Sequence, residues 1–188
     1  PISHFEKMLY DNAQLLRVYG HLARIVDDPL PGRIAEEIVD FLRRDLRVAG
    51  GFASSLDADA AGVEGSTYVW TRDQLREVLG DDDGDWAAAL FGVTVSGTFE
   101  HGTSTLQLRS EPDDPARYAD IRRRLLAARA ERPQPARDDK VVTSWNAMAV
   151  TALAELGAAC GREDWVDLAI EVLTGLNDNH LVDGELRR

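Results

Sequence analysis

Three carboxylates stand close together in the short stretch DADAAGVEG at residues 57–65. Asp57, Asp59 and Glu64 lie within eight positions on a connection that its glycines make flexible. Two carboxylates, one protonated and one ionised, can cleave a glycosidic bond or move a proton beside a carbonyl group. The alternative interpretation is a hydrogen-bonded turn in which the aspartates accept from backbone amides. Because the three residues are so dense in one loop, we predict that they are catalytic.

The same stretch matches the opening D-x-D-x-x-G of a calcium-binding EF-hand loop. Ala61 and Tyr68, however, occupy positions at which that loop needs oxygen ligands. The single cysteine, Cys160, excludes a cysteine-built zinc site or a CxxC redox pair within the chain. The sequence therefore predicts no metal and no cofactor, and Cys160 is expected to be a small buried residue of an apolar helix.

Lysine is rare in this chain, which has 19 arginines but only two lysines, Lys7 and Lys140. Because ammonium and guanidinium groups are not interchangeable in shaped sites, the two lysines are either special positions or the result of chance. We predict a catalytic role for Lys140 beside Asp57 or Asp59, where a compact cation would decide which carboxylate stays ionised.

Candidate ligand-binding residues cluster at the expected starts of two helices. Near residue 143 they are Asp139, Trp145 and Asn146, at a helix N-terminus that would favour an anionic or polar ligand. The alternative there is helix capping with a core tryptophan. A second cluster lies at the start of the first helix, and its residues either line a pocket or cap the helix. It comprises His4, Glu6, Lys7, Tyr10 and Asp11.

Two small β-hairpins are expected to carry the remaining candidates. Residues 50–70 read as two strands, FASSL and STYVW, joined by the acidic tip and ending at Trp70, a candidate ligand contact. Residues 93–108 read as a second hairpin with His101 near its tip. An imidazole there would be a proton shuttle and ligand contact, or else a histidine that faces solvent.

Most of the chain has helical periodicity. Ser3 and Glu6 form a candidate capping box for the first helix. DDDGD at residues 81–85 is predicted to be a solvated turn. Arg124 is expected on a solvated face of a helix that is rich in arginine. Thr143 or Ser144 would cap a helix that ends at Gly161. The expected helices span residues 4–26, 32–48, 71–79, 86–91, 115–132, 144–160 and 164–176.

The composition is that of an ordinary globular domain, 44% apolar and 29% charged over 188 residues. A formal net charge of −12 opposes binding to a phosphate backbone, so we expect no nucleic-acid partner. No apolar run approaches membrane-spanning length, and no signal-peptide core is present, so a cytoplasmic location without membrane contact is expected. The chain begins with proline, which suggests a piece of a longer protein.

A weak internal repeat supports a fold of stacked helix pairs. A helix, a turn, a second helix and a Gly/Asp-containing loop occur at residues 4–70 and again at residues 143–188. Helical hairpins whose functional loops gather at one end are typical of a solenoid or a closed α/α toroid. Four long helices cannot close such a ring, so we expect exposed apolar faces that meet missing segments of the chain or a second copy.

Four ordered motifs resemble those of the bacterial YyaL family, whose animal relatives are spermatogenesis-associated thioredoxin-like proteins. Ala53 and Ala147 depart from the family's pattern. The resemblance implies an all-α fold, a partial (α/α)6 toroid similar to N-acylglucosamine 2-epimerases and six-hairpin glycosidases, with the family's thioredoxin-like domain outside residues 1–188. The motifs are HFEKMLYDNAQLL, GGFASSLDADAAGVEGSTYVWT, GTFEHGTSTLQL and RPQPARDDKVVTSWNAMAVTALAELG.

Two functions follow as expectations. The first is a carbohydrate-active domain, an epimerase or isomerase in preference to a glycoside hydrolase, that takes a sugar-like small molecule. Its acid and base would come from the hairpin carboxylates, while the lysines orient the substrate. The second is a non-catalytic binding or structural module that serves the attached thioredoxin-like domain.

Overall fold

The computed structural model describes residues 5–187, which form two compact units. Of the described residues, unit 1 comprises Phe5 and Ala58–Pro135, and unit 2 comprises Glu6–Asp57 and residues 136–187. Both are mainly helical, in agreement with the mostly α fold expected from the sequence. Within the described residues, no helix combines the length and apolarity needed to cross a bilayer.

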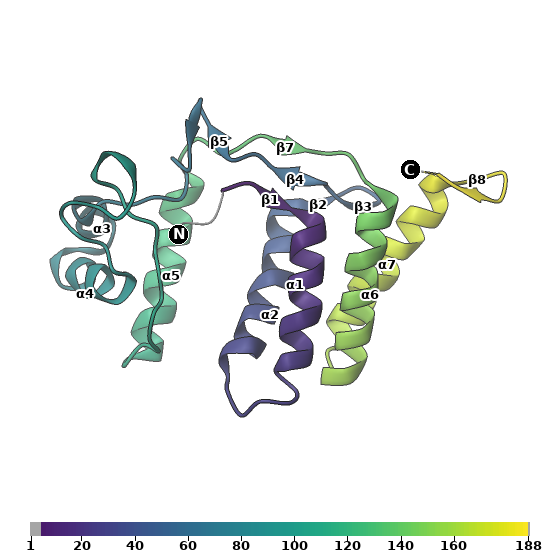
Figure 1. Cartoon of the computed structure of the whole chain (residues 1–188), viewed down its shortest axis with the longest axis horizontal. Helices are drawn as coiled ribbons and strands as arrows, with labels where there is room; N and C mark the ends of the chain where they lie inside the picture. The colour runs from purple at the N-terminus through teal and green to yellow at the C-terminus, as the bar shows by residue number, and fades with distance from the viewer. Residues whose placement is uncertain (1–4, 188) are drawn as a thin grey trace. The chain divides into compact units, whose positions relative to one another are not determined.

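Unit 2 contains two antiparallel helix pairs (Figure 1), α1 (Leu9–Leu22) with α2 (Leu30–Phe41) and α6 (Thr143–Cys160) with α7 (Glu163–His180). Helix α1 also packs on α6. A short π-helix, η1 (Leu42–Leu46), continues α2 and buries both of its terminal leucines. The core between the helices is aliphatic and fully buried, and its largest members include Leu9, Leu16, Leu42, Leu46, Leu153, Leu156 and Val172.

Short strands cross one end of these helices (Figure 1). Strand β4 (Ser55–Leu56) lies between β1 (Lys7–Met8) and β7 (Arg137–Asp138), antiparallel to both. Strand β2 (Arg47–Val48) pairs with β3 (Gly51–Phe52), and β8 (Leu181–Val182) pairs with β9 (Glu185–Leu186). The starts of α1 and α6 and the ends of α2 and α7 therefore share the strand-bearing end of unit 2.

Unit 1 packs three helices around its own apolar core. They are α3 (Arg72–Leu79), α4 (Asp81–Phe91) and α5 (Pro115–Ala130), joined by a loop that contains the 3-10 turn η2 (Glu100–Gly102). A hairpin of β5 (Asp59–Ala60) and β6 (Val63–Glu64) precedes them. The core is centred on buried aromatic and aliphatic side chains, Trp70, Leu75, Leu79, Phe91, Ile121 and Leu125.

The predicted hairpin over residues 50–70 is wrong in its pairing. FASSL does not pair with STYVW: β3 pairs with β2, and β4 pairs with β1 and β7. Residues 66–70 form no strand, although Trp70 makes an isolated bridge to Ser104. Only the acidic tip is a hairpin, with Asp59 opposite Glu64. Strand β2 is adjacent in the sequence but was predicted as helix, whereas the partners of β4 are too far away in the sequence to leave a local pattern.

Residues 93–108, predicted as a second hairpin, form a compact loop instead. The amides of Thr98 and Phe99 both donate to the carbonyl of Thr103 at 2.9 Å, which closes a tight turn around η2. His101 lies in this turn, as predicted, and its φ of 55° places it in the left-handed region. Histidine tolerates that region better than most residues do.

DDDGD is helical rather than a solvated turn. Helix α4 begins at Asp81, where carboxylates stabilise a helix N-terminus. Asp85 accepts hydrogen bonds from the guanidinium groups of two α3 arginines. Asp83 accepts from Arg124, which is therefore half-buried against α4 and not on the solvated face expected for it. These ion pairs fasten α3 and α5 to α4.

Several predicted helix ends differ from those observed. The first helix starts at Leu9 because residues 7–8 are a strand, and its N-cap, Met8, makes no side-chain cap. The expected capping box cannot be assessed because Ser3 is outside the described residues. Thr143 does not cap α6 either, since the N-cap is Val142. The left-handed Gly161 ends α6 as predicted, but Cys160 beside it is exposed rather than buried.

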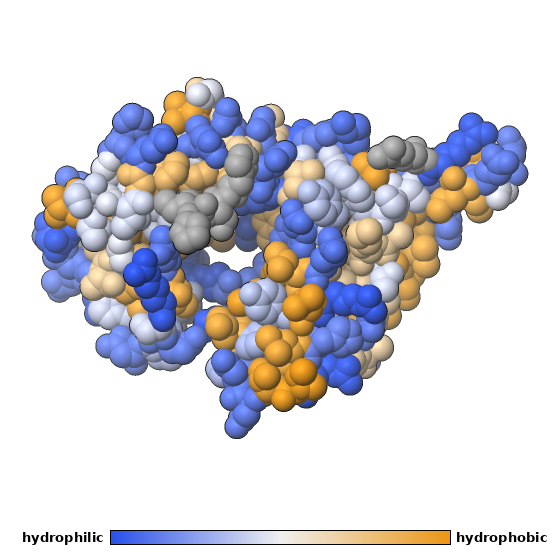
Figure 2. Space-filling view, in the orientation of Figure 1, coloured by the Kyte–Doolittle hydropathy of each residue, from blue (hydrophilic) through white to orange (hydrophobic). Residues whose placement is uncertain are grey.

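Apolar faces of the unit 2 helices are exposed, as expected for an incomplete ring. On α1, Leu15 and Val18 are 46% and 61% exposed, and Ile25 follows in the next loop. Figure 2 shows apolar side chains gathered over this helix and loop. On α7, Ile170 and Leu173 are exposed one turn apart. These faces lack cover within the described part of unit 2.

Candidate functional site

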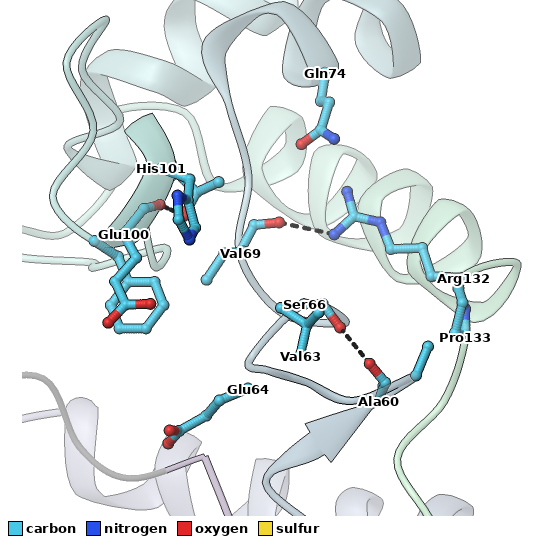
Figure 3. A pocket seen from close by; sticks show the side chains of 13 residues that line it. Ala60, Val63, Glu64, Ser66, Val69, Gln74, Glu100, His101, Arg132 and Pro133 are labelled. Atoms are coloured by element: carbon cyan, nitrogen blue, oxygen red, sulfur yellow. Dashed lines mark hydrogen bonds between the residues drawn. The ribbon is translucent and has the colours of Figure 1, made fainter.

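A pocket of about 440 Å³ lies within unit 1 (Figure 3). The volume falls in the roughly 300–1,000 Å³ range of small-molecule sites, which are mostly apolar with a few converging polar groups. Segments from the β5–β6 hairpin, the start of α3, the η2 turn and the end of α5 surround it. The lining residues are Ala60, Ala61, Val63, Glu64, Ser66, Val69, Gln74, Phe99, Glu100, His101, Thr103, Arg132 and Pro133.

The acidic hairpin brings Glu64 to the pocket. Its two-residue tip, Ala61–Gly62, has positive φ at both positions, 52° and 77°, as a type I′ hairpin turn requires. Asp59 and Glu64 are directly opposed in the register, so their side chains lie about 5 Å apart at the Cβ atoms. Both are exposed, and Glu64 is the one that lines the pocket.

The η2 turn places two groups able to transfer protons beside one another. Glu100 and His101 both line the pocket, and Figure 3 shows them on the opposite side from Arg132. The Thr103 hydroxyl donates to the Glu100 carbonyl at 2.7 Å and stabilises the turn. Phe99 packs edge-to-face on Phe5, with ring centroids 5.3 Å apart. The turn is thus held by backbone and aromatic contacts, which leaves the imidazole exposed.

Arg132 stands just beyond the end of α5 and supplies the cation of the pocket. Its guanidinium carbon lies 3.7 Å from the ring centroid of Trp70, and Nη1 donates to the carbonyls of Thr67 at 3.2 Å and Val69 at 2.8 Å. Burial lowers the pKa of Arg132, and repulsion by Arg129 lowers it further. Trp70, a predicted ligand contact, is only 2% exposed, so it supports Arg132 instead of lining the pocket.

The predicted catalytic carboxylates are divided between the units. Asp57 belongs to unit 2, where its backbone amide donates to the Ala136 carbonyl at 2.8 Å, whereas Asp59 and Glu64 belong to unit 1. Of the three, the structure brings Asp59 and Glu64 together. The hairpin therefore supplies one pair of neighbouring carboxylates.

Lys140 pairs with a residue that was not among its predicted partners. Its Nζ lies 2.9 Å from Oδ2 of Asp138, and its side chain is 74% exposed. This hydrogen bond is the main cause that lowers the pKa of Asp138. Asp139 likewise pairs with its neighbour Arg137. Within unit 2 the ion pair of Lys140 is thus local, and it is not with Asp57.

The two predicted ligand clusters of unit 2 meet at the strand-bearing end. The Tyr10 and Trp145 rings are in edge contact, with centroids 4.9 Å apart. Lys7 lies in β1 opposite Leu56, so it is on a strand and not in the helix predicted over residues 4–26. Glu6 and Asp11 are exposed, and His4 lies outside the described residues.

Asn146 has a structural role. It is fully buried, its Oδ1 accepts from the amide of Phe52 at 2.7 Å, and its Nδ2 donates to the carbonyls of Phe52 at 3.0 Å and Val142 at 3.1 Å. Gly51 must be glycine here, because a Cβ would lie 2.9 Å from Asn146 Oδ1. The Asn146 amide therefore binds backbone groups of Phe52 and Val142, a structural role that neither prediction for this cluster included.

Arg132, Glu100 and Gln74 were missed as site residues in the sequence. Glu100 and His101 lie together in the motif GTFEHGTSTLQL, and Arg132 is the first residue of the motif RPQPARDDK. These two motifs therefore contained pocket residues, but the prediction of catalytic residues was based on the acidic hairpin and on the rarity of lysine. Within the described part of the chain, no group of three or more His, Cys, Asp or Glu residues is placed to hold a metal ion.

Comparison with known proteins finds relatives that match along the whole chain. Spermatogenesis-associated protein 20 from mouse is 31% identical over 227 residues, and the rat protein is 30% identical over the same length. An uncharacterized protein of Caenorhabditis elegans is 26% identical over 224 residues. Each alignment covers 100% of this chain but only 29% of the mouse and rat proteins and 31% of the nematode protein.

These proteins are homologues of the chain over its full length, which supports the predicted resemblance to animal spermatogenesis-associated proteins. The chain spans about three tenths of their length. No protein-family model matches the sequence.

Proposed function

We propose that the chain is a segment of a carbohydrate-active protein of the spermatogenesis-associated protein 20 family, with sugar epimerase or isomerase activity in the unit 1 pocket. The observation that carries the proposal is the presence of an imidazole and two carboxylates, His101, Glu64 and Glu100, in one pocket with Arg132. Imidazole and carboxyl groups are the common general acids and bases of enzymes. Hydroxyl-rich ligands suit a pocket with several polar contacts.

The proposed chemistry is proton exchange at a carbon beside a carbonyl group. A base removes the proton, the electron pair of the C–H bond forms a carbon–carbon double bond, and the carbonyl π electrons move to the oxygen to give an enolate. A proton then returns to the same carbon, or to the former carbonyl carbon as the carbonyl group forms at its neighbour. His101 on η2 is the proposed base, and Glu64 on β6 is the proposed acid. Glycoside hydrolysis is less favoured, because the closely spaced carboxylates Asp59 and Glu64 are exposed and only Glu64 lines the pocket.

The wider architecture is part of the same proposal. We infer that unit 2 contributes helix pairs to an (α/α)6 toroid in a cytoplasmic protein that also carries a thioredoxin-like domain. Two antiparallel helix pairs with their strand-bearing loops at one end support it. The exposed faces of α1 and α7 would contact other segments of the longer chain or a second copy.

The activity is tested by proton NMR in deuterium oxide. The 188-residue chain is incubated with glucose, mannose, N-acetylglucosamine or N-acetylmannosamine, and deuterium uptake at the carbon beside the carbonyl is followed. We expect uptake with at least one sugar, and a loss of about a hundredfold or more in His101→Ala and Glu64→Gln. The matched controls are His21→Ala and Glu77→Gln, which change the same residue types away from this pocket.

The second candidate is a non-catalytic module. Two predicted site residues favour it, because their polar groups already bind other groups of the protein. Asn146 binds the backbone of Phe52, and Lys140 forms an ion pair with Asp138. Sugar binding without deuterium uptake would support this candidate and exclude the epimerase. If no sugar binds and none exchanges, both versions of a sugar site in unit 1 are wrong.

A further inference from the structure

Arg132 differs from four other arginines of unit 1, Arg72, Arg76, Arg117 and Arg124, in having no carboxylate partner among the described residues. Arg72 and Arg76 both donate to Asp85, with closest distances of 2.9 and 2.6 Å. Arg117 and Arg124 both donate to Asp83, at 2.8 and 2.9 Å. Arg132 is half-buried, yet its only side-chain hydrogen bonds within residues 5–187 go to two backbone carbonyls.

The unused part of the Arg132 side chain has the shape of an oxyanion receptor. Both carbonyl contacts are made by Nη1, whereas Nε and Nη2 have no hydrogen-bond acceptor in the described part of the chain. These two atoms form the edge of a guanidinium that donates two parallel hydrogen bonds to a carboxylate or phosphate. Stacking on Trp70 and the Nη1 contacts hold the group in place, so little rotamer freedom would be lost on binding.

Gln74 provides a second donor on the same side of the pocket. Its Oε1 accepts from the amide of Thr71 in the capping box of α3, which leaves its amide group as donor. Figure 3 shows Gln74 near the Arg132 guanidinium, whereas the Glu64 and Glu100 carboxylates lie across the pocket. The pocket is therefore polarised, with donors at one end and acidic groups with His101 at the other.

We propose that Arg132 is an anion-binding residue of this pocket and that its ligand is a sugar acid or sugar phosphate rather than a neutral sugar. The inference rests on the proposed function, since it names the substrate class of the same site. The negative group would lie at Arg132 and Gln74, and the hydroxyl or carbonyl end would face His101. An anion also compensates a cation that lacks a buried counter-charge.

The probes are glucose, glucuronate, glucose 6-phosphate and inorganic phosphate, titrated into the 188-residue chain. Binding is followed by the shift of the Trp70 indole N–H resonance in NMR, because that ring lies directly under the guanidinium. We expect glucuronate or glucose 6-phosphate to bind at least about tenfold more tightly than glucose, the scale of a hydrogen bond to a charged group. The relative strength of the two separates a carboxylate ligand from a phosphate ligand.

Arg132→Gln should abolish the preference for the anionic sugar, while the control Arg123→Gln, an exposed arginine on α5, should retain it. Because Arg132→Gln also removes stacking and could unfold unit 1, Gln74→Glu is the second variant. Glutamate preserves the capping box but adds a carboxylate on the same side of the pocket as Arg132, so it should weaken the anionic probes about tenfold or more relative to glucose.

The two proposals fail in different ways. Equal affinity for glucose and for the anionic sugars, unchanged in Gln74→Glu, overturns the anion site and leaves the sugar site standing. Binding of inorganic phosphate as tight as that of glucose 6-phosphate, with no glucose binding, retains the anion site but overturns a sugar as its ligand. Absence of binding by all four probes overturns both.

Discussion

Removal of the Asn146 amide should destabilise unit 2 strongly. Ala53 donates to the Leu46 carbonyl in the β2–β3 ladder, so the amide and carbonyl of its neighbour Phe52 point to the other side, where Asn146 binds both. Phe52 and Asn146 are both fully buried, which excludes water as a replacement. Asn146→Ala therefore leaves one buried donor and one buried acceptor of Phe52 without partners.

The expected loss follows from these two groups. An unsatisfied buried hydrogen-bonding group costs about 1–3 kcal/mol, so Asn146→Ala should lower the free energy of unfolding by roughly 2–6 kcal/mol. The third contact adds little, because the Val142 carbonyl still accepts from the backbone amide of residue 146 at 3.0 Å. A loss of this size is a large share of the roughly 5–15 kcal/mol that stabilises an ordinary domain.

Urea denaturation followed by circular dichroism measures the change, and hydrogen exchange at the Phe52 amide locates it. The control is Thr151→Ala on the exposed side of the same helix, which should change the free energy by about 0.5 kcal/mol or less. If Asn146→Ala costs less than about 1 kcal/mol, or if the Phe52 amide keeps its protection, the role assigned to Asn146 is wrong.

Three further predictions concern other contacts. Gly84→Ala should destabilise unit 1 by about 1–3 kcal/mol in thermal unfolding, because the new Cβ would lie 2.7 Å from Arg76 Cα; an unchanged midpoint would contradict the packing. Asp85 has a pKa lowered to about 2, mainly by hydrogen bonds from Arg76, so its stabilisation is present above pH 4 and is lost as the pH falls towards 2; Asp85→Asn should remove that part of the acid dependence, and an identical pH profile would contradict it. Lys140→Arg should change stability by less than about 0.5 kcal/mol in urea, since the exposed pair with Asp138 is local; a larger loss would show that Lys140 makes a structural contact beyond this pair.

Local sequence signals predicted the helices well and the strand pairing poorly. A helix was predicted over residues 71–79 and α3 is Arg72–Leu79, and the left-handed Gly161 ends α6 as predicted, because both signals depend on residues a few positions apart. By contrast, Ser55 pairs with Met8 and Asp138, and no periodicity relates segments so distant in the chain. The hairpin over residues 50–70 was therefore assigned a wrong partner for each strand.

The candidate site was predictable in part for a related reason. His101 and Glu64 were found because a histidine and a carboxylate in glycine-rich loops stand out by residue type. Arg132 did not stand out among 19 arginines, since its distinction is the lack of a carboxylate partner, a property of its neighbours in space. Rarity of lysine was a weaker guide, as the local pair of Lys140 with Asp138 indicates.

Asn146 and Arg132 mark the difference between a polar residue that builds the fold and one that is available to a ligand. Both are held by hydrogen bonds to backbone, but Asn146 donates both amide hydrogens to backbone and is fully buried, so a substrate cannot reach it. Arg132 uses one nitrogen of three and keeps an edge with two donors. Unused donor capacity on a rigid side chain that lines a pocket is a stronger physical reason to expect a ligand than the density of charged residues along the sequence. By this criterion we propose the Arg132 pocket of unit 1, in preference to the lysine-bearing segment before α6, as the functional centre of the chain.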